Sequence, residues 1–315
     1  MKLQTQIPLK SVSQNTIDYK SKIVLFGSCF SEHIGAKFKQ SKFNAFSNPF
    51  GILFHAKAIE NLIEKSVLGY NYSEEDVFEL NEQFQCFDAH SKLNCLTAKD
   101  LVSKLNSALE HTKRELEKAT HVVITLGTSW VYKHKASDKI VANCHKVPQN
   151  NFEKVLLSSE DISKSLQNCI TQIQSINPRV HFIFTVSPVR HIKDGFVENT
   201  LSKAHLIAGI HSVIKIAKNT SYFPSYEIVM DELRDYRFYN EDLIHPNPIA
   251  VNYIWEYFLT TWTSLETQAI IKEVNVVLKG IKHKPFNKNS IAHNKFLKAL
   301  ELKKIALKQD YSIII

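Results

Sequence analysis

Four short runs rich in β-branched and aromatic residues alternate with longer stretches in which apolar residues recur every three or four positions. The runs cover residues 22–26, 121–126, 180–186 and 226–230, and each has the length of a buried strand. The longer stretches have the periodicity of amphipathic helices and cover residues 32–39, 56–67, 101–118 and 163–176. Strands that alternate with helices favour a parallel sheet with both faces covered. We therefore predict an α/β fold built on a central parallel sheet.

Beyond the last run, the chain continues into a lysine-rich extension. The pattern predicts a helix over 253–261 that closes the first domain, then helices over 265–279 and 291–308, with a break from Gly280 to Pro285. Of the formal net charge of +8, residues 265–315 supply +6, from 10 Lys against 4 acidic residues, which leaves +2 for the rest. We therefore divide the chain into a domain of residues 1–262 and a basic helical extension of residues 263–315.

Composition and charge exclude several classes of protein. With 44% hydrophobic and 22% charged residues, the chain is globular and not disordered. Every apolar run is far shorter than the ~20 residues of a membrane-spanning helix, and the N-terminus has no apolar signal segment, so we expect no membrane span and a cytoplasmic protein. Lysines spread along amphipathic helices usually form a solvated face, and no aromatic platform interleaves them. Nucleic-acid binding is therefore not favoured, whereas a peripheral attraction to anionic lipid or glycan stays open.

The cysteines do not indicate a disulfide framework or a metal site. They form an odd set without the C-x-x-C spacing, which indicates free thiols: Cys29, Cys86, Cys95, Cys144 and Cys169. Two groupings with histidine, of Cys86 and Cys95 with His90 and of Cys144 with His145, match no zinc spacing. We expect no metal and no cofactor.

The residues that follow the predicted strands are polar and specific. In parallel α/β sheets, ligands bind in the crevice beyond the carboxyl ends of the strands, so these residues are the candidates for chemistry. They are Gly27-Ser28-Cys29-Phe30-Ser31, Gly127-Thr128-Ser129-Trp130, Ser187-Pro188-Val189-Arg190-His191 and, further along, Asp242-Leu243-Ile244-His245-Pro246.

Cys29 and Ser28 are the candidate nucleophiles, because they occupy the predicted turn from the first strand into the first helix. The N–H groups and positive dipole end of a helix stabilise a nearby anion, so a thiol at this place can have a lowered pKa. The alternative is that Cys29 is a small apolar residue packed at the end of a buried strand.

A nucleophile of this kind needs a base, and the base needs a third group that fixes its tautomer. Asp242 and His245 offer that pair. His33 is a competing base, because it lies four residues beyond Cys29 and so on the same face of the helix.

Gly51 and Ser129 are candidate donors to an oxyanion, one through its backbone N–H and the other through its hydroxyl. Gly51 is equally explained by a need for its backbone angles. Arg190 suits an anionic group of a substrate, but it could instead pair with Asp194 or Glu198.

These motifs together resemble the GSCFA domain family, named after the Gly-Ser-Cys-Phe-Ala signature, with Ser31 in the place of the alanine. The resemblance covers most of residues 20–260. It extends through Asn48-Pro49-Phe50-Gly51, Leu126-Gly127-Thr128-Ser129-Trp130, Asn143-Cys144-His145-Lys146, Ser187-Pro188-Val189-Arg190-His191, residues 231–239 and Asp242-Leu243-Ile244-His245-Pro246. Arg190, His145 and Asn143 are the candidate substrate-binding residues within these motifs.

The GSCFA family is similar to the SGNH (GDSL-type) hydrolases, which implies a flavodoxin-like three-layer α/β/α fold and hydrolysis or transfer of esters, commonly acetyl groups on carbohydrates. In their Gly-Asp-Ser motif, Cys29 takes the place of the nucleophilic serine and Ser28 that of the aspartate; Ser28 would serve if the turn were shifted by one residue. Ser129 stands where those enzymes have an oxyanion-binding asparagine, and Gly51 matches the glycine of their second conserved block. Asp242 and His245 match their Asp-x-x-His.

The resemblance thus implies an ester hydrolase or acyltransferase for a small-molecule or glycan ester, with His245 as the base that Asp242 orients. The rival hypothesis is a carbohydrate- or small-ligand-binding module that has lost its activity, because two positions depart from the hydrolase pattern.

Overall fold

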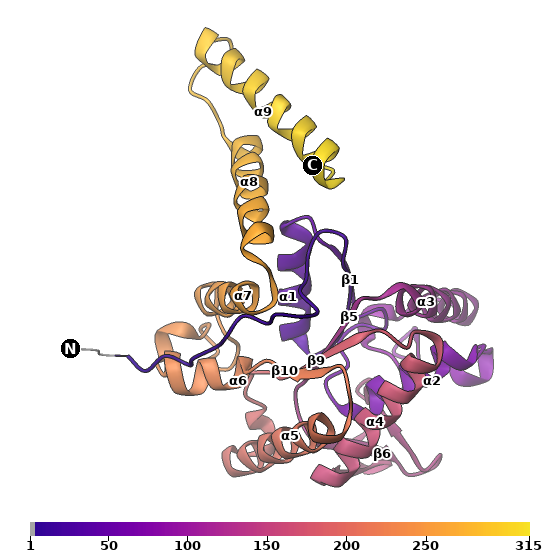
Figure 1. The fold of residues 1–315 in the computed structure, drawn as a ribbon. Helices are drawn as coiled ribbons and strands as arrows, with labels where there is room; N and C mark the ends of the chain where they lie inside the picture. The colour runs from indigo at the N-terminus through magenta and orange to yellow at the C-terminus, as the bar shows by residue number, and fades with distance from the viewer. Residues whose placement is uncertain (1–3) are drawn as a thin grey trace.

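A five-stranded parallel sheet forms the centre of the molecule, in a computed structural model that describes residues 4–315 (Figure 1). The strand order is β10-β9-β5-β1-β2, which is the 2-1-3-4-5 order of flavodoxin-like sheets. The strands are β1 (Lys22–Gly27), β2 (Asn44–Ser47), β5 (His121–Leu126), β9 (His181–Val186) and β10 (Thr220–Tyr222).

Helices cover both faces of this sheet because successive residues of each strand point to opposite sides. Val24 and Phe26 of β1 pack into the core beneath α2 (Ala56–Leu68), α3 (Ala98–Lys118), α4 (Ser159–Ile176) and α5 (Phe196–Ile216). Ile23 and Leu25 pack into a second core beneath α1 (Cys29–Gln40) and α7 (Pro248–Trp262). The predicted three-layer α/β/α fold is confirmed.

One predicted strand is wrong. Residues 226–230 are helical: a short helix α6 (Ser225–Glu227) leads into a π-helical turn (Ile228–Leu233). Ile228 and Val229 are buried against the α1 and α7 side of the sheet. A run of only five residues, here Tyr226-Glu227-Ile228-Val229-Met230, is too short for its periodicity to distinguish a strand from a helical turn. The edge strand β10 lies just before it, in the more polar Thr220–Tyr222.

Small antiparallel sheets are inserted between the core elements. One pairs β3 (Phe78–Leu80) with β4 (Gln83–Gln85), and another joins β6 (Trp130–His134), β7 (Lys139–Val141) and β8 (Phe152–Leu156). Short 3-10 turns cover Glu74–Asp76, Ser91–Leu93, Gln149–Asn151, Ile192–Asp194 and Tyr236–Phe238.

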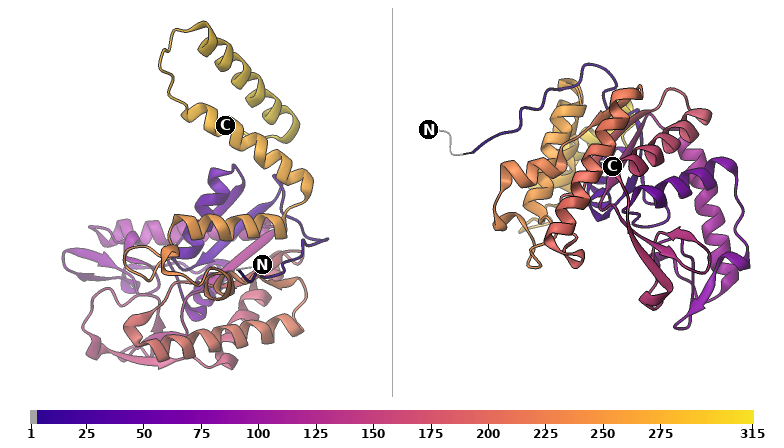
Figure 2. Two further views of the ribbon diagram at one scale, coloured as in Figure 1. Left: turned by 90° about the vertical axis from the view of Figure 1, so that its left-hand side faces the viewer. Right: turned by 90° about the horizontal axis from the view of Figure 1, so that it is seen from below.

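The C-terminal extension is a pair of helices that projects from the α/β body, as Figure 1 and the left-hand view of Figure 2 show. These helices are α8 (Leu265–Lys282) and α9 (Ile291–Tyr311). They share a small apolar core of their own, made by Val274, Val277, Leu300, Leu307 and Ile313. Across residues 4–315, no helix combines the length and apolar character that crossing a membrane requires.

Candidate functional site

The register of the sheet brings the ends of three strands to one edge. Gly27 of β1 pairs with Thr125 of β5, and Leu126 of β5 pairs with Val186 of β9. The residues that follow these strands, among them Cys29, therefore lie at the same end of three adjacent strands. This is the crevice in which ligands bind to sheets of this type.

The turn from β1 into α1 is built around Gly27. Its φ is +141°, and a Cβ at this position would lie 2.2 Å from the carbonyl oxygen of Thr125, so only glycine fits. Ser28 is 2% exposed, and its hydroxyl has no hydrogen-bond partner within residues 4–315. Cys29 is the first residue of α1 and is half-buried. Of the two candidate nucleophiles, Cys29 is the accessible one.

Burial raises the pKa of the Cys29 thiol, and the nearby charge of Glu32 raises it further. The backbone N–H of Phe30 and the charge of Lys203 oppose this shift without reversing it. The sequence-based expectation of a lowered pKa is therefore wrong, because the cost of removing the thiolate from water exceeds the stabilisation by the helix N-terminus. Cys29 is a neutral thiol near pH 7 and needs a base.

Asp242 and His245 form a tight pair. The Asp242 carboxylate accepts hydrogen bonds from the His245 imidazole Nδ1 at 2.7 Å and from the backbone N–H groups of Ile244 at 2.8 Å and His245 at 2.9 Å. These backbone N–H groups and the imidazole hold the pKa of the Asp242 carboxyl at about 2. With Nδ1 donating to a carboxylate, Nε2 of His245 is the proton acceptor, which is the arrangement of an oriented general base.

His245 is near the loop after β9, and its charge acts both on that loop and on α1. The backbone N–H of Arg190, in that loop, donates to the carbonyl of Ile244 at 3.4 Å. Burial lowers the pKa of His191, in the loop, and partial removal of the imidazole from water lowers that of His33, in α1, although its side chain is exposed over much of its surface; a charge on His245 lowers each pKa further. His33 itself is exposed and has no hydrogen-bond partner in the described chain, so no group orients it as a base.

The two predicted oxyanion donors are both engaged. The N–H of Gly51 donates to the carbonyl of Asn48 at 2.9 Å, and the Ser129 hydroxyl donates to the carbonyl of Ser202 at 3.1 Å. Gly51 has a φ of +74°, and a Cβ there would lie 2.5 Å from the Cβ of His90. Its conformation and its packing each require glycine.

Lys203 is a residue of the site that the sequence analysis missed. It comes from α5 and is 2% exposed, and its Nζ donates to the carbonyls of Gly127 at 2.6 Å and Ser187 at 2.7 Å. Burial lowers its pKa to about 7. The signal was present in the sequence, because Lys203 lies on the same helical face as Leu206 and Ile210, where an apolar residue is expected.

His191 belongs to a stretch that the sequence analysis names as a candidate for chemistry, but no role is assigned to it there. Its Nε2 is buried and has no hydrogen-bond partner among residues 4–315. This atom lies 3.1 Å from the point that a Cβ on Gly127 would occupy, so the imidazole packs directly on the end of β5. Burial, with the charges of Lys203 and His245, lowers the pKa of His191 to about 3. The ring is therefore a neutral imidazole at neutral pH.

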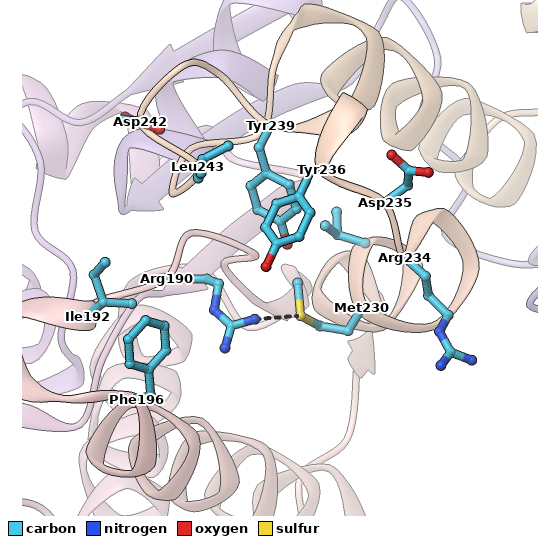
Figure 3. Close-up of a pocket in the computed structure, with 11 residues that line it drawn as sticks. Arg190, Ile192, Phe196, Met230, Arg234, Asp235, Tyr236, Tyr239, Asp242 and Leu243 are labelled. Carbon is cyan, nitrogen blue, oxygen red and sulfur yellow. Dashed lines mark hydrogen bonds between the residues drawn. The ribbon is translucent and has the colours of Figure 1, made fainter.

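The three candidate substrate-binding residues occupy different places. Arg190 lines a cavity of about 620 Å³ together with Asp242 (Figure 3). Asn143 lines a separate cavity of about 260 Å³. His145 is 5% exposed and has a φ of +51°; its imidazole Nε2 bonds to the carbonyl of Cys86 at 2.7 Å, and its N–H donates to Asn143 Oδ1 at 2.9 Å. These bonds indicate that His145 shapes its own loop.

The cysteines and histidines do not gather around a common point. All five cysteines are free thiols. Within the part of the chain that the structure describes, no three His, Cys, Asp or Glu side chains are arranged to hold a metal ion.

Two family models match the chain. The model described as the GSCFA family matches residues 22–258, and the model described as the C-terminal domain of GSCFA domain proteins matches residues 274–314. No curated protein matches it.

Proposed function

From the premise that the chain belongs to the GSCFA family, we propose that it hydrolyses or transfers the acyl group of an ester, with Cys29 as nucleophile and His245 as base. The observation that carries the proposal is the Asp242–His245 pair, held at 2.7 Å and tied to the loop after β9. An accessible thiol at the start of α1 and an oriented imidazole beside that helix are the two parts that acyl transfer needs.

The reaction proceeds in two steps. Nε2 of His245 takes the proton of the Cys29 thiol as sulfur attacks the ester carbonyl; the carbon–oxygen bond then breaks, and the same proton passes to the leaving alcohol. In the second step, His245 deprotonates water or an acceptor hydroxyl, which attacks the thioester, and the proton returns to sulfur. Asp242 keeps the imidazole in the required tautomer throughout.

The developing oxyanion needs donors that are not already bonded. The backbone N–H of Cys29, at the first position of α1, is one. Nε2–H of neutral His191 is the second: it has no partner in residues 4–315, but the atom is buried, so substrate binding would have to expose it. Gly51 and Ser129 would first have to give up the hydrogen bonds to Asn48 and Ser202. A neutral imidazole that donates to an oxyanion is an established type of electrostatic catalyst.

Lys203 acts as a positioning residue. By bonding the carbonyls of Gly127 and Ser187, it joins the ends of β5 and β9 directly beneath the site. The likeness of the motifs to SGNH hydrolases supports esters as the substrate class and makes an O-acetylated carbohydrate the first candidate. The division of the chain near residue 262 and the cytoplasmic location are further parts of the proposal. The first matched region ends at residue 258 and the second begins at residue 274, so the proposed boundary falls between them.

The experiment is a panel of acetyl and longer acyl esters assayed with the wild type and with Cys29→Ala, Ser28→Ala and His245→Ala. We expect Cys29→Ala and His245→Ala to lose turnover by about 100-fold or more, and Ser28→Ala to retain most of it. The control is His111→Ala, since His111 is exposed on α3. Circular dichroism checks that each variant folds.

Two results would contradict the proposal. Turnover that survives in Cys29→Ala and disappears in folded Ser28→Ala would move the nucleophile to Ser28. Tight binding of acetylated sugars with no turnover of any ester would favour the rival hypothesis of a binding module.

A further inference from the structure

The cavity beside Asp242 holds a cation that no carboxylate neutralises. The loop after β9 contributes Arg190, the start of α5 contributes Phe196, and the segment after the π-helical turn contributes Tyr236 and Tyr239. Figure 3 shows the guanidinium of Arg190 between Phe196 and Met230, facing the tyrosine rings. The volume of about 620 Å³ accommodates a small organic molecule.

The acidic residues around Arg190 already have other partners. Asp242 is bonded to His245, and Asp235 lies 3.3 Å from the guanidinium of Arg237. Asp194, one of the two partners considered from the sequence, pairs with Lys154 at 2.5 Å. No carboxylate of residues 4–315 lies within 4.0 Å of the Arg190 guanidinium.

The guanidinium also has few hydrogen bonds. Its Nη1 contacts the sulfur of Met230 at 4.0 Å, and its buried Nε has no partner in the described residues. The charge of Arg190 and its hydrogen bonding to the Tyr239 phenol lower the pKa of that phenol against the larger raising effect of burial, but a neutral phenol does not compensate a charge. A half-buried charge with unused donors is costly, and an anionic ligand removes that cost by accepting two parallel hydrogen bonds.

The position of Arg190 is fixed relative to the catalytic pair. Its backbone N–H donates to the carbonyl of Ile244, the residue before His245, and Asp242 and Leu243 form part of the cavity wall. A ligand anchored at Arg190 therefore lies against the segment that carries the base. Its apolar portion would contact the rings of Tyr236, Tyr239 and Phe196.

We propose that this cavity binds the anionic group, a carboxylate or a phosphate, of the molecule that carries or receives the acyl group, and that Arg190 is its specificity-determining residue. The claim about acyl transfer rests on the proposed function. The claim about anion binding does not, and it can be measured without turnover.

The binding experiment uses isothermal titration calorimetry of the 315-residue chain with 4-hydroxybenzoate, phenyl phosphate and the neutral methyl 4-hydroxybenzoate. We expect one anionic probe to bind more tightly than the neutral one. Arg190→Met should weaken the affinity for that anion by about tenfold or more and leave the affinity for the neutral probe unchanged. Arg190→Lys should recover part of the affinity, since it keeps the charge without the planar fork. The stronger of the two anions identifies the group that the cavity takes.

The control is Arg114→Met, which removes the same charge from an exposed residue of α3 that does not line the cavity. Loss of anion binding as large in Arg114→Met as in Arg190→Met would overturn the proposal, because it would indicate long-range attraction only. Equal binding of the anions by folded Arg190→Met and wild type would also overturn it. Thermal melting of each variant checks the fold.

The kinetic experiment compares 4-acetoxybenzoate with methyl 4-acetoxybenzoate. If the acyl-transfer function holds, Arg190→Met should lower kcat/KM for the anionic ester by the factor measured for binding and leave the neutral ester unchanged. Anion binding through Arg190 with cleavage of neither ester would refute the hydrolase and keep the anion site. Cleavage of both esters with no preference and no effect of Arg190→Met would refute the anion site and keep the hydrolase.

Discussion

Replacement of Lys203 by methionine should change how the stability of the protein depends on pH. Lys203 is buried, and its amine has two acceptors in the described structure, Gly127 O and Ser187 O, which the two N–H bonds of a neutral amine satisfy. Burial lowers its pKa from 10.5 to about 7. Protonation of the folded state is therefore disfavoured.

The sign of the effect follows from proton binding. Between pH 7 and 10.5 the unfolded chain carries the Lys203 proton and the folded chain does not, so the free energy of unfolding rises with pH by up to about 1.4 kcal/mol per pH unit. Below pH 7 the folded chain also carries the Lys203 proton, so the full cost of burying the charged amine lowers the free energy of unfolding. Between pH 7 and 9 this one group should add roughly 2 kcal/mol of stability.

The assay is urea unfolding of the wild type and Lys203→Met at pH 7, 8 and 9. Subtracting the two curves removes the contributions of other titrating groups. The variant leaves the carbonyls of Gly127 and Ser187 without their donor, which costs about 1–3 kcal/mol for each buried group. We expect the wild-type advantage to grow by roughly 2 kcal/mol from pH 7 to 9.

The control is Lys215→Met, on the exposed side of the same helix α5. It removes one lysine without removing a buried amine, so its difference from the wild type should not grow in the same way. A wild-type advantage over Lys203→Met that is flat between pH 7 and 9 would refute the reasoning, because it would mean that the buried amine titrates as it does in water.

Three further predictions concern single residues. Burial raises the pKa of the Cys29 thiol, so its alkylation by iodoacetamide, followed by peptide mapping, should reach half its maximal rate only at a pH above ~8.5, the pKa of an ordinary thiol; a maximal rate already at pH 7 would contradict this. Gly51→Ala should lower the free energy of unfolding by more than Gly69→Ala, because both glycines have φ above +70° but only Gly51 would place a Cβ 2.5 Å from His90; equal losses in urea would show that this contact relaxes. Burial lowers the pKa of His55 to about 4, so its contribution to stability is present above pH 6.5 and falls by up to roughly 3 kcal/mol as the pH drops towards 4; His55→Gln should flatten this part of the pH–stability curve, and an unchanged slope would refute it.

The central strands could be predicted from the sequence because strands buried on both faces appear as continuous apolar runs. This holds for β5 and β9, whose six residues are all buried. The edge strands β2 and β10 could not be predicted in the same way, because they are short and only partly buried. The run at 226–230 was predicted to be a strand because five residues are too few for periodicity to distinguish a strand from a helical turn.

Site features that local sequence forms could be predicted, whereas those that depend on contacts between distant residues could not. The Asp242–His245 pair could be predicted because a local turn forms it, with both partners three residues apart. His191 lies in a candidate stretch and Lys203 interrupts an apolar helix face, but their roles could not be predicted, because those roles come from contacts with Gly127, which is distant in the sequence. The pKa of Cys29 was predicted in the wrong direction because the cost of burial depends on the whole fold.

The most direct test of the central claim is mass spectrometry of the protein after brief mixing with p-nitrophenyl acetate, followed by peptide mapping. We expect a single acetyl group on Cys29, as a thioester that hydroxylamine removes, with formation slowed about 100-fold or more in His245→Gln. An acetyl group on Ser28, or a thioester that forms equally fast in His245→Gln, would contradict it.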